Sequence, residues 1–465
     1  MRIRRLIASF LMLFLAPAVL PAHAKESFTV QKITQLQYEI GRSDNMLDKP
    51  SIEWSGDGET LLLDSRTLFQ WKKKKLMQIT GPDGTACRIS LSPGALFVCA
   101  DESGAAAIGS LASFEFRPVS EKLTVDNVIW SRDSSRFFCL EGTGVYLFEV
   151  SRLYGDLIYE GVCDFFLSTD EKRMILQMGR KDEKDPQYTL INVDRSCRRP
   201  FPRGMLFREE RIVHPSIKNI SGDFRRVLLE KKAPPGKGFG LFKVDWRNSL
   251  IDEKLLLEDC RGNQDAVFSA DLGRIALTCR DGNDDPAMLV MSSSGEILVK
   301  FSPKKGWNYR APLWSPHSDW ILWNYIDIAR KEGDRTRFLV TDPKGVTLQF
   351  LPGNFSNLEV DWSPRGDYIL MREEAQKMEH GEYVVYDLKG KKSREIFNDS
   401  RSRITSRPVW SPDGRFIAVI DYSTFQKREK KVEKKGGVQR EYECVYFREQ
   451  VFMYRPAEDS LQLLW

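Results

Sequence analysis

Short tight turns, each preceded by an apolar residue and a serine and followed by an apolar run, divide most of the chain into similar units. Successive anchors lie 37 to 53 residues apart. Short apolar runs on both sides of a turn predict a strand hairpin rather than a helix. A repeat of about 40–50 residues built from strands is typical of propeller blades. The anchors are Trp54-Ser55, Leu91-Ser92, Trp130-Ser131, Leu167-Ser168, Ile220-Ser221, Phe268-Ser269, Trp314-Ser315, Trp362-Ser363 and Trp410-Ser411.

The fullest copy of the repeat, at 410–420, shows how each unit is built. Its turn reads Ser-Pro-Asp-Gly. There Pro presets φ, Asp hydrogen-bonds its own backbone and Gly supplies positive φ. A third apolar strand follows each hairpin, as at 383–387, and a fourth follows another turn, as at 346–350. Each unit therefore predicts four strands.

These units predict an all-β fold, a β-propeller of four-stranded blades, as a single domain over 51–465. One sheet of about 40 residues cannot bury both faces alone, whereas sheets stacked around an axis can. The anchor Trp side chains are expected between neighbouring blades, with Trp314, Trp362 and Trp410 at equivalent buried positions. Nine hairpins are visible, but the units at Leu167 and Ile220 are weak. The sequence leaves eight and nine blades open.

The hairpin motif at Trp54, Trp314, Trp362 and Trp410 resembles the repeat of TolB-like β-propeller proteins. The resemblance covers about 51–465. It implies a propeller that binds a protein or peptide in the cell envelope. The same repeat occurs in propellers attached to serine peptidases and in some sugar lyases, so the resemblance implies a fold more strongly than a role. TolB carries an α/β domain ahead of its propeller, and the segment 25–50 is too short for one.

The first residues are typical of a secretory leader. Residues 1–24 begin with three arginines, continue through an apolar run and end in Ala-His-Ala. A basic start, a short apolar core and a small-x-small end predict a signal peptide cleaved after Ala24. We therefore expect a periplasmic or secreted protein with no transmembrane segment after cleavage; an uncleaved anchor is the alternative. Removing the leader lowers the formal net charge from +5 to +2. This near balance predicts no nucleic-acid partner.

All eight cysteines follow the leader. An even number of cysteines in an oxidising compartment permits disulfides. Cys87 and Cys99 flank one hairpin turn, and Cys260 and Cys279 flank another, so these two pairs are candidate disulfides. The alternative is that all four are buried apolar thiols. Without a Cys-x-x-Cys or Cys/His cluster, we expect no metal site.

The chain shows no catalytic motif. His214, His317 and His380 are far apart, and neither His-Glu-x-x-His nor Gly-x-Ser-x-Gly occurs. We therefore expect no catalytic residues and no cofactor. The main hypothesis is a non-enzymatic scaffold that binds an envelope protein or peptide. The alternative is an envelope polysaccharide lyase or hydrolase whose site is assembled at the channel mouth from several blades.

Two further segments are candidate contact sites. Lys and Arg outnumber Glu in the basic loop 426–439, which interrupts the last blade. It predicts either a peripheral contact with acidic partners or anionic lipid, or a solvated loop. Trp307, Tyr309 and Arg310 lie in a polar stretch between two blades. Because these residue types are enriched at interface hot spots, they predict a partner-binding edge; the alternative is that Trp307 packs beneath the loop.

Overall fold

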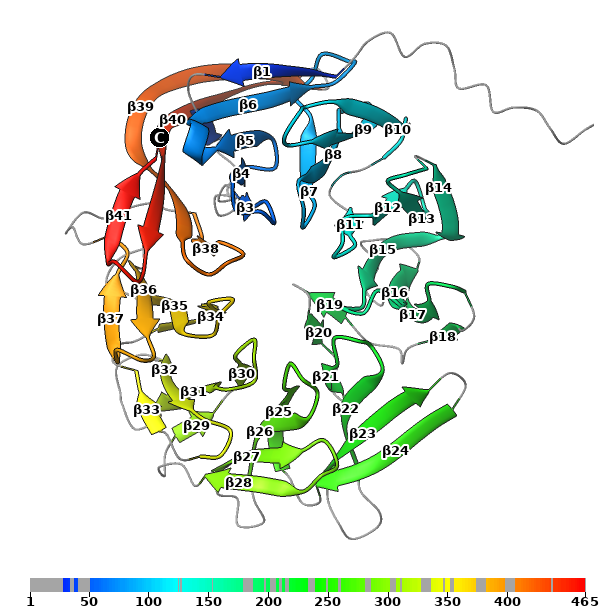
Figure 1. The fold of residues 1–465 in the computed structure, drawn as a ribbon, viewed down its shortest axis with the longest axis vertical. Coiled ribbons are helices and arrows are strands. Elements are labelled where there is room, and N and C mark those ends of the chain that lie inside the picture. The colour runs from blue at the N-terminus through cyan, green and yellow to red at the C-terminus, as the bar shows by residue number, and fades with distance from the viewer. Residues whose placement is uncertain are drawn as a thin grey trace, which may run out of the picture.

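Nine antiparallel four-stranded blades surround a central opening in the computed structural model (Figure 1). The structure describes residues 28–33, 37–40, 51–123, 125, 128–152, 154–178, 187–195, 198–200, 206–208, 211–213, 217–232, 239–247, 250–257, 261–280, 286–301, 307–309, 312–327, 336–345, 348–351, 355–373, 382–397, 406–435 and 438–464. Within these ranges the only helical element is a 3-10 turn, η1 (Trp71–Lys73). The same ranges contain no helix with the length and apolar character needed to cross a membrane. The predicted fold class is confirmed, with nine blades.

The blades follow one another along the chain, and each begins with its innermost strand. Blades 1 to 3 comprise β3 (Ile52–Trp54), β4 (Thr60–Leu63), β5 (Thr67–Gln70) and β6 (Lys75–Thr80); β7 (Arg88–Leu91), β8 (Leu96–Ala100), β9 (Ala106–Ser110) and β10 (Phe116–Ser120); and β11 (Ile129–Trp130), β12 (Arg136–Glu141), β13 (Gly144–Glu149) and β14 (Gly155–Tyr159). Blades 4 to 6 comprise β15 (Val162–Leu167), β16 (Arg173–Met178), β17 (Gln187–Asn192) and β18 (Arg198–Pro200); β21 (Ile217–Ile220), β22 (Arg226–Lys232), β23 (Phe239–Arg247) and β24 (Leu250–Leu257); and β25 (Arg261–Phe268), β26 (Arg274–Arg280), β27 (Pro286–Ser292) and β28 (Ile297–Phe301). Blades 7 to 9 comprise β30 (Leu313–Trp314), β31 (Ile321–Asp327), β32 (Thr336–Thr341) and β33 (Leu348–Phe350); β34 (Phe355–Trp362), β35 (Tyr368–Glu373), β36 (Glu382–Asp387) and β37 (Lys392–Glu395); and β38 (Val409–Trp410), β39 (Ile417–Lys435), β40 (Val438–Arg455) and β41 (Ser460–Leu463).

A few short strands lie outside the four-stranded pattern. A hairpin of β19 (Leu206–Arg208) and β20 (Arg211–Val213) lies between blades 4 and 5, and β29 (Trp307–Tyr309) pairs with β31. In the N-terminal segment, β1 (Thr29–Ile33) pairs with β6 on the outer edge of blade 1. The next strand, β2 (Gln37–Ile40), pairs with β40 of blade 9. The segment therefore adds an outer strand to both blades that meet where the ring closes.

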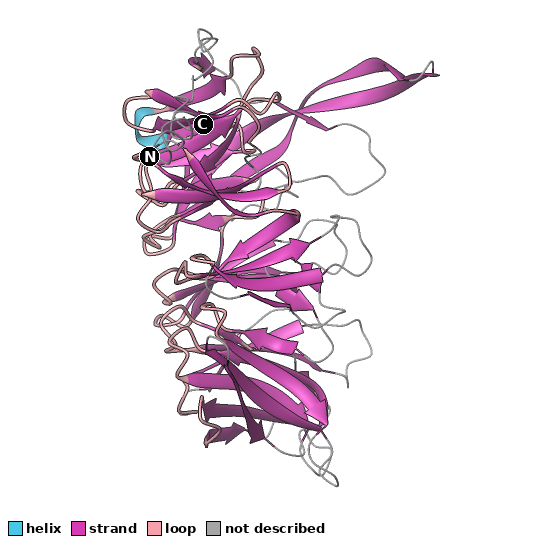
Figure 2. Ribbon diagram, turned by 90° about the vertical axis from the view of Figure 1, so that its right-hand side faces the viewer, coloured by secondary structure: helices cyan, strands magenta, loops and turns pink. Residues whose placement is uncertain are grey.

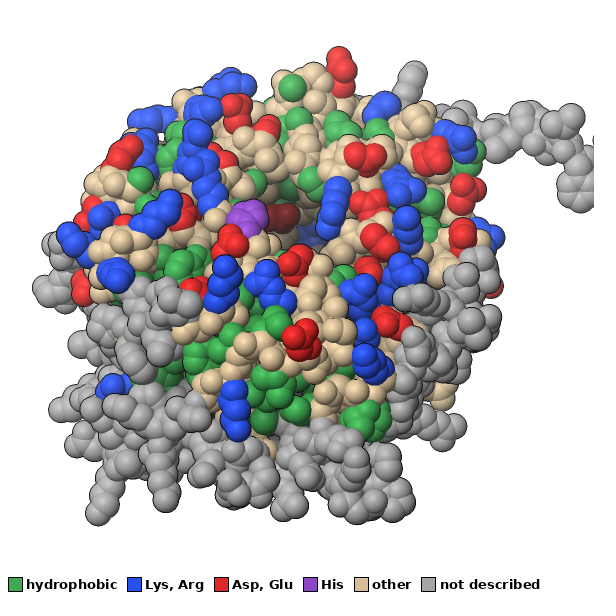
Figure 3. All heavy atoms as spheres, turned by 60° about the horizontal axis from the view of Figure 1, so that its bottom comes forward, with side chains coloured by type: hydrophobic (Ala, Val, Ile, Leu, Met, Phe, Trp, Pro, Cys, Tyr) green, Lys and Arg blue, Asp and Glu red, His purple; other side chains and the backbone are tan. Residues whose placement is uncertain are grey.

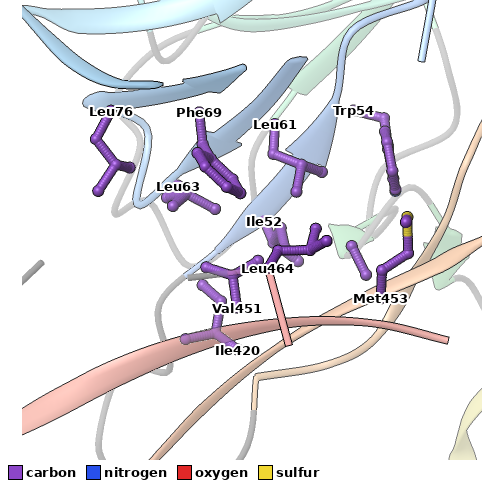
Figure 4. Packing of buried hydrophobic residues seen from close by; sticks show 11 residues of the cluster. Ile52, Trp54, Leu61, Leu63, Phe69, Leu76, Ile420, Val451, Met453 and Leu464 are labelled. Carbon is purple, nitrogen blue, oxygen red and sulfur yellow. The ribbon is translucent and has the colours of Figure 1, made fainter. Parts of the chain in front are cut away.

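The hydrophobic core is divided among the blade interfaces. Nine buried clusters occur in the described ranges, and each combines side chains from two adjacent blades. Figure 4 shows the cluster that closes the ring, where Leu61 and Phe69 of blade 1 face Val451 and Met453 of blade 9. Because both faces of a blade are apolar, each blade is stable only between two neighbours. Closure therefore occurs by face-to-face packing of two complete blades.

The anchor Trp side chains pack between blades, with one partial exception. Trp314 and Trp362 are 7% and 9% exposed, as predicted. Trp410 is only half-buried; its ring stacks on that of Tyr368, itself partly exposed, at 6.1 Å between centroids. The Trp54 indole N–H donates to the Val409 carbonyl at 3.2 Å, a hydrogen bond across the closing interface. Indole burial supplies area, and such hydrogen bonds fix the alignment of neighbouring blades.

Candidate functional site

The turns between the first and second strands of all nine blades gather at one mouth of the ring. We call them the rim turns; they span residues 55–59, 92–95, 131–135, 168–172, 221–225, 269–273, 315–320, 363–367 and 411–416. Figure 2 shows the described loops concentrated on one side of the ring, and the long hairpin of β39 and β40 leaving on the other. The repeated serine motif therefore builds one continuous surface.

A buried serine organises each rim turn. The serines are 0–2% exposed. In blade 9, Ser411 Oγ donates to Asp413 Oδ1 at 2.6 Å and accepts the Phe416 N–H at 3.0 Å. Ser55 makes the equivalent bonds to Asp57 at 2.6 Å and Thr60 at 2.9 Å. The hydroxyl thus satisfies polar groups that the tight turn would otherwise bury unpaired. This explains why serine recurs beside the apolar anchor.

The turn carboxylates are held in the ionised state. Hydrogen bonds from the hydroxyl of Ser131 and from the backbone N–H and hydroxyl of Ser135 lower the pKa of Asp133 to about 2. Burial in the turn raises the pKa of Asp271 and Asp413, but hydrogen bonds from the turn serine and a backbone N–H outweigh it, so both pKa values are lowered. These groups act as fixed negative charges at neutral pH.

Arginine side chains join consecutive rim turns across the blade interfaces. Five residues after the turn serine, four successive blades carry an arginine that reaches the next turn. The bonds are Arg136 Nη2 to Glu171 Oε2 at 3.0 Å, Arg173 Nη1 to the Asp223 carbonyl at 3.0 Å, Arg226 Nη1 to the Leu272 carbonyl at 3.2 Å and Arg274 Nη1 to the Ser318 carbonyl at 3.5 Å. We call this set the arginine collar. Sequence reasoning missed it, although the recurring spacing from serine to arginine was a usable signal.

Close backbone approach completes the rim between blades 1 and 2. A Cβ at Gly56 would lie 1.4 Å from the Pro93 carbonyl oxygen, so only glycine fits there. Between blades 2 and 3, the Gly94 N–H donates to Ser134 Oγ at 2.8 Å. The rim turns are therefore fixed relative to one another, which makes this mouth a rigid surface.

The outward side of the rim is charged and mixed in sign. Arg132, Lys172 and Arg225 are exposed there, as are Asp133 and Asp170. Figure 3 shows acidic and basic side chains interspersed around a hollow on this part of the molecule. The arrangement offers ion pairs and hydrogen bonds to a polar partner.

Charged groups also occur on the innermost strands. Glu53 lies between two buried residues of β3, and burial by the surrounding blades raises the pKa of its carboxyl although the side chain reaches solvent. Arg407 pairs with Asp361 at 2.6 Å, joining blades 9 and 8. Both signs of charge therefore occur on the innermost strands β3 and β34 and in the segment just before β38.

The predicted partner-binding edge lies away from the rim turns. Trp307 and Tyr309 belong to β29, whose partners on β31 run from Tyr325 to Asp327. That end of β31 is opposite its rim turn, so β29 belongs to the other face of the ring. Arg310 lies outside the described residues. The role of these three residues stays a prediction.

The structure places one predicted cysteine pair together. Cys87 and Cys99 are fully buried free thiols of one core cluster, and the Cys99 thiol donates to the Ala107 carbonyl at 3.7 Å. Burial, followed by the neighbouring Cys87 thiol, raises the pKa of Cys99 well above its usual value. In the second predicted pair, Cys279 is buried on β26, and Cys260 lies outside the described residues. Both disulfides stay predictions.

The predicted basic loop is a hairpin. Apart from residues 436–437, which lie outside the described residues, segment 426–439 belongs to β39 and β40. Cross-strand pairing continues from Ile417 with Tyr454 to Lys435 with Val438. The expectation of a loop is therefore wrong for the backbone, because ladder pairing holds a charged sequence in strands.

Among the described residues, no three His, Cys, Asp or Glu side chains form a group able to hold a metal ion.

Comparison with known proteins gives structural likeness only. No protein-family model and no curated protein matches the chain. Similar solved structures include dipeptidyl peptidase 4 from Porphyromonas gingivalis, at 12% identity and a TM-score of 0.48, over 80% of this chain and 64% of that one. An oligogalacturonate lyase from Vibrio parahaemolyticus aligns at 12% identity and a TM-score of 0.36, over 89% and 98%. A protein from Agrobacterium tumefaciens whose structure is described as that of a putative TolB aligns at 14% identity and a TM-score of 0.29, over 60% and 88%. The chain is similar to propeller proteins of several functions and is itself a nine-bladed propeller.

Proposed function

We propose that this protein is a non-enzymatic scaffold of the TolB-like kind, exported to the periplasm or beyond, that binds an envelope protein or peptide at its rim turns. The observation that carries the proposal is the rim itself. Its serines and collar arginines are engaged in bonds within and between turns, and its outer charges are exposed. A surface that is already ordered loses little conformational entropy on binding.

The pKa values of the turn carboxylates favour binding over acid–base chemistry. A general acid or base works best when its pKa lies near the operating pH. Hydrogen bonds hold the pKa of Asp133 near 2, and those of Asp271 and Asp413 are lowered as well. Such carboxylates pair well with cationic groups of a partner but are poor proton donors at neutral pH. This supports the scaffold over a hydrolase or lyase whose acid lies in these turns.

Affinity capture from envelope extracts with paired variants tests the proposal. Arg132→Glu/Lys172→Glu reverses two exposed rim charges, whereas Lys389→Glu/Lys392→Glu reverses two exposed charges at the outer turn of blade 8. The rim variant is expected to capture about ten-fold less of a specific partner, or less still, because interface charges act locally. The blade 8 variant should retain it, and both should melt like the unmodified protein.

Two results would overturn the proposal. One is capture that is unaffected by the rim variant. The other is release of new reducing ends from envelope polysaccharide by the purified protein, which would establish the enzyme alternative.

A further inference from the structure

Two turns rich in lysine lie on the outer part of the face that carries the rim turns. In blade 1, four consecutive exposed lysines, Lys72 to Lys75, join β5 to β6. In blade 8, the turn from β36 to β37 carries three more exposed lysines, at positions 389, 391 and 392. We call the segments 71–75 and 387–392 the lysine turns. Neither of them belongs to the rim turns.

Both lysine turns are fixed against the rim turn of their own blade. The Trp71 indole N–H donates to the Gly58 carbonyl at 3.0 Å. In blade 8, the Leu388 N–H donates to the Asp367 carbonyl at 3.1 Å. The two turns therefore face the same way as the rim. Blade 9 separates them, because it packs on blade 8 on one side and on blade 1 on the other (Figure 1).

Each lysine turn has a lysine where the backbone favours glycine. Lys74 has a φ of +48° and Lys391 has a φ of +53°. Residues with a Cβ rarely adopt this left-handed conformation, which glycine adopts without steric cost. A lysine at both positions therefore adds positive charge at some conformational cost. This cost favours a role for the charge.

Positive charge exceeds negative charge over this sector of the face. The sector comprises the rim turns and outer turns of blades 8, 9 and 1, at 55–59, 71–75, 363–367, 387–392, 411–415 and 455–459. Ten of its side chains are Lys or Arg, and seven are Asp or Glu. Figure 3 shows basic side chains gathered at the upper left, the side on which Figure 1 draws these three blades. The sector is thus suited to an anionic ligand.

The acids of the sector already have partners, whereas most lysines of the lysine turns have none. Among the described residues, no carboxylate lies within ion-pair distance of the lysines at 73–75, 389, 391 and 392. Lys72 is the exception, since it pairs with Glu59 at 2.8 Å. The other acids accept hydrogen bonds or pair within the sector: Asp57 with Ser55, Asp367 with Ser363, Asp387 with the Lys389 N–H, Asp413 with Ser411, Glu458 with Arg455 and Asp459 with Tyr454.

We propose that the two lysine turns bind an anionic phospholipid surface, so that the protein attaches to a membrane through the edge of the rim face at blades 8, 9 and 1. Lysines held near an anionic surface each add to the attraction, and several together give stable attachment. Neither lysine turn exposes a large apolar side chain, since Trp71 is half-buried and Leu388 is buried. The contact is therefore electrostatic and reversible, without insertion into the bilayer.

The spacing of the lysine turns favours a lipid surface over an acidic peptide. A small anion reaches only one of the turns, whereas a flat surface reaches both. A peptide laid from one turn to the other crosses the outer turn of blade 9, where Glu458 and Asp459 are 62% and 54% exposed. Those two carboxylates repel an acidic chain. Lipid headgroups are separate molecules, so anionic ones can gather at the lysines and leave blade 9 uncontacted.

Co-sedimentation with lipid vesicles tests the proposal. The protein is used from Lys25 onward, because the apolar run of the predicted leader would itself enter a bilayer. Vesicles of phosphatidylcholine mixed with phosphatidylglycerol are compared with vesicles of phosphatidylcholine alone. We expect at least about ten-fold stronger binding to the anionic vesicles. This preference should weaken as the salt concentration rises, because salt screens exposed charges.

Paired charge reversals locate the contact. Lys73→Glu/Lys75→Glu alters the lysine turn of blade 1, and Lys389→Glu/Lys392→Glu alters that of blade 8. Both leave the left-handed lysines in place. Each variant should weaken binding to anionic vesicles by about ten-fold or more. Lys73→Gln/Lys75→Gln should lose less than the reversal, because it removes charge without adding acids, and it serves as the test if the reversal lowers the melting temperature.

The matched control is Lys122→Glu/Lys254→Glu. It makes the same charge change at two exposed lysines outside the sector, one after β10 and one on β24. It should weaken vesicle binding by less than about three-fold, because exposed charges are screened beyond about 10 Å.

Four results would overturn the proposal. They are equal binding to the two kinds of vesicle, an equal loss in the control variant, a loss confined to one lysine turn, and binding of soluble polyglutamate without binding of vesicles. The last result would assign the lysine turns to an acidic protein segment. Partner capture from detergent extracts, which contain no bilayer, is a separate readout that the lysine-turn variants leave intact.

Discussion

At the scale of single residues, the sequence predicted the turn chemistry but not the contacts between turns. Asp413 accepts the Arg415 N–H at 3.0 Å, and Gly414 has a φ of +67°, as the Ser-Pro-Asp-Gly motif predicts. Local rules suffice there because all partners lie within a few residues. The bond from Arg173 to Asp223 joins residues 50 positions apart. Such a partner depends on how blades pack, which no local pattern encodes.

The Asp133 carboxylate should contribute a distinct pH dependence to stability. The pKa of this group falls from 3.8 to about 2 on folding, so its stabilising effect is complete above about pH 4 and is lost as the pH falls through 2. Asp133→Asn should therefore be less stable than the unmodified protein at neutral pH. The difference should shrink towards zero at about pH 2.

Chemical denaturation at a series of pH values measures the difference. The control is Asp319→Asn. Asp319 is an exposed residue of a rim turn, and the turn serine Ser315 accepts a hydrogen bond from its backbone N–H rather than donating one to its carboxylate. If the difference in free energy of unfolding between the unmodified protein and Asp133→Asn stays constant across the acid range, Asp133 does not have this role.

The export that we propose would bring the neighbouring thiols of Cys87 and Cys99 into an oxidising compartment, which predicts a disulfide between them. Both lie in the core cluster between blades 1 and 2, and the Cys87 thiol contributes to the raised pKa of Cys99, so the two side chains are neighbours. Burial raises the pKa of Cys99, so the folded thiols react slowly and the bridge must form during folding. Non-reducing digestion and mass spectrometry of periplasmic protein should find the two peptides linked, whereas the buried Cys139 should be alkylated after denaturation. Recovery of both Cys87 and Cys99 as alkylated thiols would exclude the bridge.

At the scale of elements, apolar periodicity identified every blade hairpin but missed the long extension of β39 and β40. The predicted strand at 383–387 corresponds to β36, and the predicted hairpin at Trp410 corresponds to β38 and β39. Lys and Arg outnumber Glu in segment 426–439, which has few apolar residues, so the sequence alone predicts a solvated loop there. The strands β39 and β40 are formed by pairing with each other and with β2, a long-range contact. Apolar periodicity reports burial, and it therefore does not predict strands that are held by backbone pairing.

The arginine collar should contribute measurably to blade packing. Arg173 is 17% exposed and donates across the interface of blades 4 and 5. Arg173→Met keeps the apolar stem but leaves the Asp223 carbonyl without this donor, at an expected cost of roughly 1–3 kcal/mol in the free energy of unfolding. Arg415→Met is the matched control, because Arg415 is 66% exposed and pairs only within its own turn; it should cost less than about 0.5 kcal/mol. If Arg173→Met and Arg415→Met lower the free energy of unfolding in urea by the same amount, the arginine collar does not stabilise blade packing.

At the scale of the whole molecule, the sequence left the number of blades and the closure of the ring open. The units at Leu167 and Ile220 proved to be full blades, with β15 to β18 and β21 to β24. Closure could not be predicted because it joins the two ends of the repeat. In the structure, blade 9 packs on blade 1 through a shared core, and the N-terminal segment adds β1 and β2 outside that core. Phe28 also stacks on Phe116 of blade 2 at 5.7 Å.

This arrangement assigns closure to the core and only edge protection to β1. Gln31 is exposed on β1, opposite Gln78, so Gln31→Pro disrupts the outer strand without removing a buried side chain. Hydrogen exchange should then rise in β6 and remain slow in β40 near Val451, whereas Gln31→Ala should change neither. Leu61→Ala, within the closing core, should instead accelerate exchange in both blades and cost about 2–5 kcal/mol. If Gln31→Pro also exposes Val451, then the N-terminal strand, rather than packing of blade 9 on blade 1, holds the ring closed.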